Sequence, residues 1–174
     1  KLPPVNAEGQ QRMAVRAAAR TAMGGKFDRA ENNDLDDRCL MRNAGPPTLN
    51  ANYNSNQHIV QGPGWVLILV EESHDARIVS LDGREPSPNA VRQWMGVSRG
   101  RWEGETLVVE TTNFNSKNPF RGQSSEHMRV TEWFTRVADD RILYRFTVED
   151  EATWDQPWTA EMPMWKSGGP LFEH

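Results

Sequence analysis

The chain has 174 residues, a formal net charge of −4, 37% hydrophobic residues and one cysteine, Cys39. This length suits one domain with its own core. The mild charge argues against general nucleic-acid binding, and no stretch reaches the roughly 18 apolar residues of a transmembrane helix. One cysteine excludes an intrachain disulfide within these residues, and the start without Met suggests that a leader or tag has been removed.

Residues 1–57 are expected to form a helix and an extended loop that packs on the rest of the chain or docks on a partner. Residues 7–23 are rich in Ala and Arg, lack Pro and precede two glycines, a pattern that predicts a helix with a glycine stop signal. Residues 26–57 are dense in Asn, Asp, Gly and Pro, and long loops of this kind are often functional or disordered. A basic stripe on the helix, interpreted as a solvated face, is formed by Arg12, Arg16 and Arg20.

Residues 58–174 are expected to form a β-domain, because short apolar runs alternate there with turn signals. The stretch SPNAVRQWMG (87–96) predicts one short inserted helix with Ser87 as its N-cap. The predicted strands are 58–61, 65–72, 77–81, 99–102, 106–114, 127–137, 141–150 and 157–166, and residues 171–174 are a candidate for a last one.

Alternation with a period of two distributes the strand side chains over two faces. An aromatic face is expected to hold Trp133, Tyr144, Phe146 and Trp158 with smaller apolar residues. A charged face, interpreted as solvated, is expected to hold Glu110, Glu132, Arg145, Glu149 and Glu161. A curved antiparallel sheet covers its own aromatic face with few helices. We therefore expect a mainly β fold, an antiparallel β-barrel of lipocalin-like architecture, with a β-sandwich as the alternative.

A polar cluster follows the apolar run WVLILV and contains Glu71, His74, Asp75 and Arg77. A histidine beside a carboxylate is suited to act as a general base near neutral pH. In this hypothesis Asp75 or Glu71 orients His74, and Arg77 or Arg121 stabilises a developing oxyanion. Polar residues are also ordinary at a chain reversal, and that interpretation stays open.

A second polar loop, FRGQSSEHM (120–128), carries two further catalytic candidates, Arg121 and Glu126, separated by small residues that let a ligand approach. An exposed connector is the alternative. Trp154 and Trp158 are candidate aromatic walls of a pocket, or ordinary core residues. Other ligand-binding candidates, in phase with the aromatic face or just beyond its strands, are Asn113, Arg129 and Asp150, for which structural ion pairs are the alternative.

No cofactor and no metal site are indicated. The stretch DLDDRC, with Asp34, Asp36 and Asp37, lacks the glycine and the terminal glutamate of an EF-hand loop. The chain contains no GxSxG, P-loop, GxGxxG, HExxH or paired CxxC motif.

Several stretches together resemble a family of bacterial proteins that are usually predicted to be exported and share no established activity. They are DRCL (37–40), NSNQHIVQGPGWV (54–66), HDARIVSLDGR (74–84), RQWMGVSRGRWEGETLVVETTNF (92–114), RGQSSEHMRVTEWFTRV (121–137) and TVEDEATWDQPWTAEMPM (147–164). The resemblance implies a periplasmic or secreted protein. Family members continue beyond LFEH into a segment with a cysteine, so the resemblance also implies a disulfide partner for Cys39.

The family commonly reads Glu-Met-Ile-His-Asp where this chain has EESHD (71–75), so Glu71, His74 and Asp75 match the family pattern. This match favours a functional role for His74. Val97 stands where the family usually has Asp, and no role is transferred to that position.

Two functions follow as hypotheses. The first is an exported barrel that binds a small hydrophobic or aromatic molecule, with cofactor-independent acid–base activity of a lyase, isomerase or hydrolase as an extension. It predicts a concave, aromatic-lined pocket. The second is a non-enzymatic accessory or interaction subunit of the cell envelope, which contacts a protein partner through residues 1–57. Neither hypothesis includes a nucleic-acid partner or a transmembrane segment.

Overall fold

A computed structural model of the chain describes residues 3–35, 37–41, 45–49, 56–71, 75–84, 91–117 and 120–169. Within these residues one α-helix precedes eight strands, and two short 3-10 turns lie at Ala30–Asn32 and Phe120–Gly122. The elements are α1 (Ala7–Ala22), β1 (Gln57–Gly62), β2 (Trp65–Val70), β3 (Ala76–Ser80), β4 (Val97–Glu103), β5 (Thr106–Thr112), β6 (Arg129–Ala138), β7 (Arg141–Glu149) and β8 (Trp158–Trp165).

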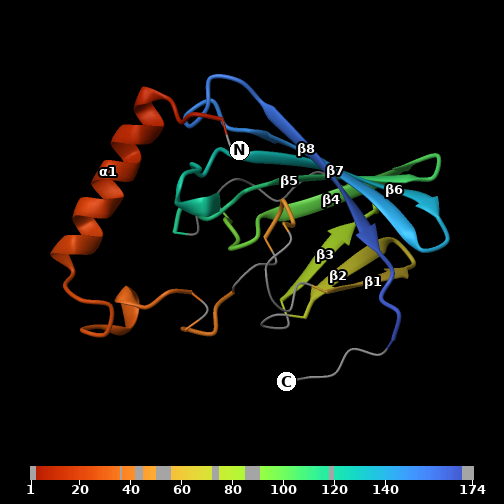
Figure 1. The fold of residues 1–174 in the computed structure, drawn as a ribbon, viewed down its shortest axis with the longest axis horizontal. Helices are drawn as coiled ribbons and strands as arrows, with labels where there is room; N and C mark the ends of the chain where they lie inside the picture. Colours follow the sequence, from red (N-terminus) through yellow and green to blue (C-terminus); the bar gives the residue numbers. More distant parts are fainter. Residues whose placement is uncertain are drawn as a thin grey trace.

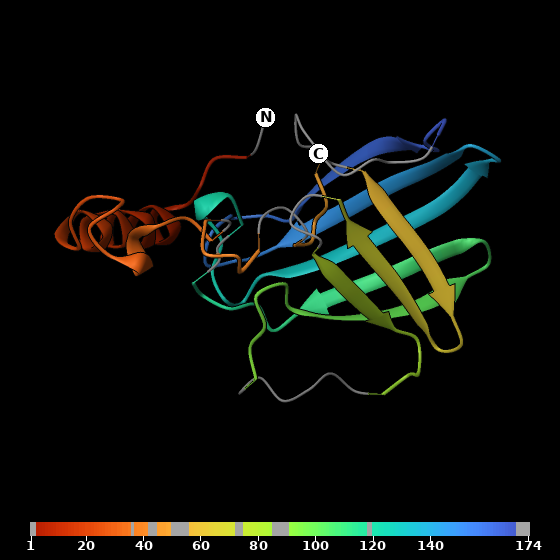
Figure 2. The same ribbon diagram turned by 90° about the horizontal axis from the view of Figure 1, so that it is seen from below.

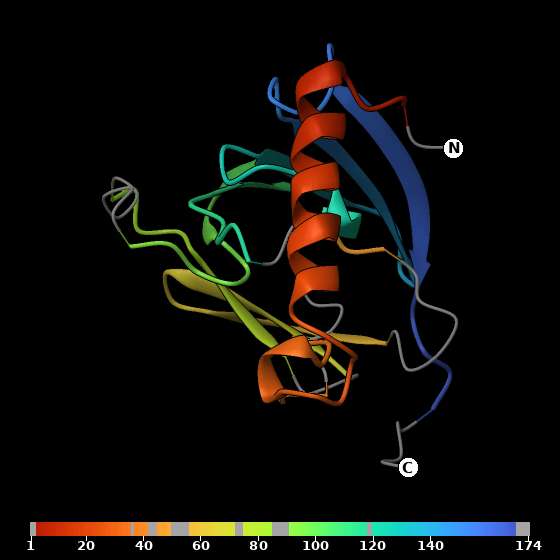
Figure 3. The same ribbon diagram turned by 90° about the vertical axis from the view of Figure 1, so that its left-hand side faces the viewer.

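The eight strands form one sheet in the order β1 to β8, which curls into a half barrel (Figure 1 and Figure 2). The prediction of a mainly β, barrel-like fold is therefore confirmed. β1 and β8 are the two edges of the sheet, and hydrogen bonds between described residues do not join them. Seen from the side of α1, the strands curl behind the helix (Figure 3).

Six of the seven strand pairs are antiparallel, but β3 and β4 run parallel, with Val79 opposite Ser98. The reason is the long connection between them, which returns the chain to the end of the sheet where β3 began. Of the predicted inserted helix (87–96), residues 87–90 lie outside the described residues, and the segment 91–96 is not helical. It forms a bridge between Gln93 and Phe114 and a turn in which Gly96 N donates to Gln93 O.

The predicted N-terminal helix is confirmed. α1 begins after Asn6, whose side chain accepts a hydrogen bond from Gly9 N at 2.9 Å, and it ends at Met23 before Gly24, which has a φ of 98°. The helix stands at one end of the half barrel, apart from the strands (Figure 1 and Figure 2). Only Gly9 of the helix is buried.

The arginine stripe of α1 is not simply a solvated face. Arg12 donates to Ala152 O at 2.9 Å, and Arg16 donates to Ser124 O at 3.0 Å. These bonds attach the helix to the loops between β5 and β6 and between β7 and β8. The third arginine, Arg20, forms an exposed pair with Asp34 at 3.0 Å.

The predicted faces of β6 are inverted in the structure. Glu132 is fully buried and points into the half barrel, whereas Trp133 lies on the outer face beneath the guanidinium of Arg145, 4.4 Å from the ring centroid. A one-residue shift moves every side chain of a strand to the other face. The sequence did not settle the phase, because Trp133 and Phe134 are adjacent and either phase places one aromatic ring inside.

The core fills the interior of the half barrel. Part of the long N-terminal loop enters it, because Pro46, Pro47 and Thr48 are buried and Leu49 packs on the core. The fully or nearly fully buried side chains include Val66, Ile68, Val79, Leu107, Val109, Val130, Phe134, Tyr144, Phe146, Val148 and Trp154.

Candidate functional site

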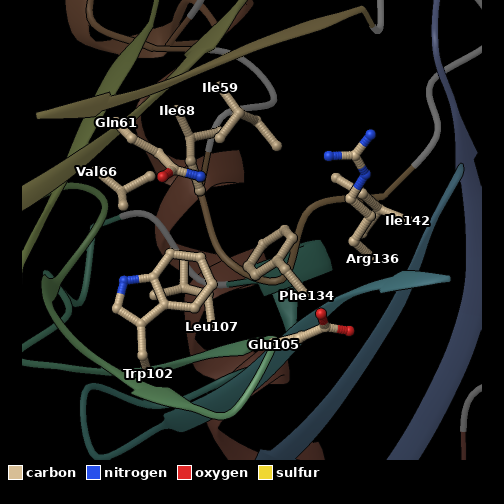
Figure 4. A pocket seen from close by; sticks show the side chains of 10 residues that line it. All are labelled: Ile59, Gln61, Val66, Ile68, Trp102, Glu105, Leu107, Phe134, Arg136 and Ile142. Atoms are coloured by element: carbon tan, nitrogen blue, oxygen red, sulfur yellow. The ribbon is translucent and has the colours of Figure 1, made fainter. Parts of the chain in front are cut away.

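A cavity of about 320 Å³ lies inside the half barrel, at the end where the hairpins β1–β2, β4–β5 and β6–β7 turn. Side chains from six strands and from the β4–β5 turn point toward it (Figure 4). The residues that line it are Ile59, Gln61, Val66, Ile68, Trp102, Glu105, Leu107, Phe134, Arg136 and Ile142.

The walls of this cavity are apolar. Strand alternation explains the arrangement, because residues two positions apart on one strand face the same side. Val66 and Ile68 of β2 are 1% and 2% exposed, and Leu107 of β5 is 4% exposed. Ile59, Phe134 and Ile142 complete the apolar surface from β1, β6 and β7.

The mouth of the cavity is polar and partly aromatic. Gln61, Glu105 and Arg136 lie there, and Trp102 is 47% exposed. Arg136 donates to Asp139 Oδ1 at 3.1 Å, which holds its guanidinium near the β6–β7 turn. The mouth therefore offers both donors and acceptors, while the interior offers only apolar contact.

A buried polar cluster lies deeper in the half barrel. Arg77 of β3 donates to both carboxylate oxygens of Glu132, at 2.6 and 3.1 Å. The hydroxyl of Tyr144 donates to Glu132 Oε1 at 2.7 Å and accepts a hydrogen bond from Thr48 N at 2.9 Å. The Phe134 ring, which lines the cavity, packs on Tyr144 with a centroid distance of 4.8 Å and links the two regions.

The surroundings of this cluster fix its protonation state. Burial lowers the pKa of Arg77 and the neighbouring Glu132 raises it, with the net result that this pKa lies above its usual range. Burial, together with the charge of Glu132, raises the pKa of Tyr144 well above its usual value of about 10. Arg77 is therefore a cation and Tyr144 a neutral phenol at neutral pH.

Of the predicted catalytic residues at the β2–β3 turn, His74 lies outside the described residues. Its candidate partners Glu71 and Asp75 are described. The Glu71 carboxylate accepts a hydrogen bond from Asn56 Nδ2 at 2.7 Å, and Asp75 O accepts one from Val70 N at 2.9 Å. The second bond closes the β2–β3 hairpin. The proposed role of His74 stays a prediction.

The other two catalytic candidates have separate partners. Arg121 has a positive φ of 49°, and its guanidinium lies 6.0 Å from the centroid of the Phe120 ring. Glu126 Oε1 lies 3.6 Å from Arg92 Nη2 and 3.9 Å from His127 Nε2. No interaction between described residues joins Arg121 to Glu126, and because His74 lies outside the described residues the predicted constellation stays a prediction.

The ligand-binding candidates are dispersed. Arg77 belongs to the buried cluster, and Arg129 is exposed on the outer face of β6, out of phase with the core, because of the phase shift of that strand. Asp150 is buried and accepts hydrogen bonds from Ser125 N at 2.6 Å and Ser125 Oγ at 2.7 Å, which organises the loop before β6. Asn113 accepts a backbone hydrogen bond from Gln93 N at 3.0 Å.

The two tryptophan candidates belong to the core. Trp154 is 2% exposed, and its ring meets that of Trp158 edge-on at 5.8 Å. Neither lines the cavity. The packing of these two residues therefore agrees with the alternative that they are ordinary core residues.

The polar residues at the cavity mouth were not singled out from the sequence, although a signal for them exists. Each follows or precedes an inward apolar residue by two positions at a hairpin end. The three pairs are Ile59 with Gln61, Leu107 with Glu105, and Phe134 with Arg136. A polar residue that lies two positions from an inward-facing apolar residue, next to a hairpin turn, thus indicates the mouth of a curled sheet.

Comparison of the chain with protein-family models, curated proteins and solved structures gives no match. The family resemblance and the expected export stay predictions. Among the described residues, no three His, Cys, Asp or Glu side chains gather as metal ligands would. No helix in the described part of the chain is long and apolar enough to cross a membrane.

Proposed function

We propose that the protein binds a small, mainly apolar molecule inside the half barrel. The observation that carries the proposal is the cavity of about 320 Å³ with apolar walls from five strands. Its volume lies at the lower end of the roughly 300–1,000 Å³ found for small-molecule sites. Burial of apolar ligand surface against these walls supplies the driving force.

The polar mouth defines the second part of the ligand. Gln61, Glu105 and Arg136 suit a molecule with one polar or charged end that stays near solvent. The exposed edge of Trp102 adds a flat surface for an aromatic or aliphatic body. The ligand class is therefore a compact amphiphile whose apolar part enters first.

Binding is a better-supported function than catalysis for this cavity. Among the described residues that line it there is no His, Cys, Ser or Lys, and its one carboxylate, Glu105, lies at the mouth rather than among the apolar walls. Acid–base activity depends on His74 and stays a separate prediction.

The proposal is tested with N-phenyl-1-naphthylamine, an apolar dye whose fluorescence rises in apolar surroundings. We expect saturable binding to the intact protein. Ile142→Trp fills the cavity from β7 and is expected to weaken dye binding at least about ten-fold by steric exclusion. Ile78→Trp places the same side chain on the outer face of β3, where Ile78 is 65% exposed, and is expected to leave binding within about two-fold.

Circular dichroism and thermal unfolding establish that both variants are folded. Ile59→Trp fills the cavity from the opposite wall and provides a second blocking variant if Ile142→Trp does not fold. Equal dye affinity in the two blocking variants and in Ile78→Trp would show that the dye binds elsewhere and would contradict the proposal.

A second candidate function is interaction with a protein partner through the N-terminal region. It is favoured by the exposure of apolar side chains there, because Val15 is 64% and Phe27 is 86% exposed while α1 buries only Gly9. A photo-crosslinking amino acid at Phe27 is expected to give a discrete adduct in cells. The same amino acid at Glu161, on the outer face of β8, is the control, and equal labelling at both positions contradicts a specific surface.

A further inference from the structure

A second hollow, the arginine groove, lies on the outer face of the sheet over β3 to β6 and has a volume of about 580 Å³. Four arginines line it, together with one carboxylate from Glu110 and the hydroxyl of Thr112. The arginines are Arg84, Arg99, Arg101 and Arg129. This concentration of positive charge stands out in a chain whose net charge is −4.

The register of the sheet explains how these side chains meet. Arg99 of β4 lies directly opposite Glu110 of β5, and Arg101 follows two residues later on the same face. Arg129 of β6 lies opposite Thr112 of β5 in the neighbouring row, by extension of the β5–β6 pairing. The groove is thus built on three adjacent strands, with Arg84 added by the turn after β3.

The carboxylate of Glu110 does not neutralise the arginine opposite it. Glu110 Oε1 accepts a hydrogen bond from Arg101 Nη1 at 2.9 Å, and Glu110 Oε2 lies 4.0 Å from Arg129 Nη1. Arg101 also pairs with Glu103 at 2.8 Å. Both carboxylate oxygens of Glu110 are therefore directed to arginines other than Arg99.

Among the described residues, Arg99 is the arginine of the groove that has no carboxylate partner. Its Nε is buried without a hydrogen-bond partner, and no described carboxylate lies within ion-pair distance of its guanidinium. Arg84, in contrast, pairs with Asp82. A guanidinium that is partly removed from water and lacks an anion has unused donors for an oxyanion.

We propose that the arginine groove binds a phosphate group. Donors reach the groove from the β3–β4 connection, β4, β5 and β6, and this spread around the hollow suits a tetrahedral oxyanion with several acceptors. Arg99 is the principal contact. The carboxylate of Glu110 is paired with Arg101 and Arg129, so the groove keeps a net positive charge. The net negative charge of the chain disfavours long polyanions, so the ligand is a single phosphate group, either free or carried by a larger molecule.

The test is a titration of the isotope-labelled full chain with inorganic phosphate, followed by amide NMR at constant ionic strength with chloride as the balancing ion. We expect saturable shifts in β4 and β5, and weaker binding of acetate. Arg99→Gln is expected to reduce phosphate affinity roughly ten-fold or more, because it removes charge-assisted hydrogen bonds. Arg145→Gln removes one charge from the same outer face, where Arg145 stacks on Trp133, and is expected to change affinity less than about two-fold.

A second arm separates free phosphate from a lipid headgroup, using sedimentation with phosphatidylcholine vesicles that contain phosphatidylglycerol. Binding of either probe that depends on Arg99 and not on Arg145 supports the site. Binding of inorganic phosphate indicates a free phosphate ligand, and binding of the vesicles indicates a lipid headgroup. Equal loss in both variants shows nonspecific attraction and overturns the proposal. Absence of saturable binding in both arms overturns it as well.

Discussion

Arg77 and Glu132 form a two-point ion pair across the interior of the half barrel, with nitrogen–oxygen distances of 2.6 and 3.1 Å. They come from β3 and β6, and their side chains are 3% and 0% exposed. The pair therefore joins two strands that are not neighbours in the sheet. A buried pair of this kind is costly to break from one side, because the remaining charge is left without a partner.

Replacement of Glu132 alone is predicted to be strongly destabilising. Glu132→Leu leaves the guanidinium of Arg77 buried and unpaired, and the free energy of unfolding is expected to fall by about 3–5 kcal/mol. The double variant Arg77→Met with Glu132→Leu removes both charges and is expected to recover most of this loss. Urea unfolding measures all three proteins, and a loss below about 1 kcal/mol in the single variant contradicts the prediction.

Glu110→Leu is the matched control, because Glu110 is also a strand glutamate paired with an arginine but is 42% exposed. Its loss is expected to stay below about 1 kcal/mol. The contrast between the two glutamates isolates the effect of burial.

Stability at high pH is predicted to depend on Tyr144. The pKa of Tyr144 is raised in the folded state by burial and by Glu132, so the folded chain keeps a proton that the unfolded chain releases above about pH 10. The unfolded state then binds fewer protons, and the free energy of unfolding falls as pH rises through this range. Below about pH 10 the contribution is fully present.

Tyr144→Phe removes this pH dependence. At pH 7 the variant is expected to be less stable by about 1–2 kcal/mol, because Glu132 and Thr48 N each lose a hydrogen bond. Between pH 9 and 11 its stability is expected to fall less steeply than that of the wild type. Urea unfolding across that range makes the comparison, and parallel curves would show that other groups control the alkaline transition.

The sequence was sufficient for α1 and the strands, but not for the segment 91–96 or for the interior of the barrel. Ala-rich composition and two glycines predicted α1, and alternation between turn signals predicted all eight strands of the described sheet. These signals are local. The parallel pairing of β3 and β4 depends on the path of a long connection, which alternation does not specify.

The candidate site depended on contacts that are distant in sequence. Glu132 was interpreted as a solvated residue because its neighbours Trp133 and Phe134 allow either phase, and only its pairing with Arg77, 55 positions away, decides the face. The catalytic hypothesis selected a histidine and nearby carboxylates by residue type. The cavity is instead lined mainly by apolar residues. Apolar residues occur throughout the sheet, so their type alone does not identify a site.

Two glycines with positive φ are predicted to differ in their tolerance of a side chain. Gly96 has a φ of 69°, and a Cβ there would lie 2.6 Å from Thr112 O and 2.8 Å from Thr111 Cγ2. Gly104, in the β4–β5 turn, has a φ of 60° but open space around it. Gly104→Ala is expected to cost about 1–2 kcal/mol from backbone strain, and Gly96→Ala is expected to cost more because it adds a steric clash. Thermal unfolding ranks the two variants, and equal losses contradict the clash.

The attachment of α1 is predicted to depend on Arg12. Its guanidinium donates to Ala152 O at 2.9 Å, to Gln123 O at 3.3 Å and to the hydroxyl of Thr153. Arg12→Ala removes these bonds from a helix that buries only Gly9, so we expect amide hydrogen exchange in α1 to become roughly ten-fold faster, while exchange in β6 and β7 stays unchanged. Arg20→Ala, which breaks only an exposed pair with Asp34, is the control and is expected to change α1 little. Unchanged exchange in Arg12→Ala would contradict the prediction and show that Arg16 and the N-terminal contacts are enough to hold the helix.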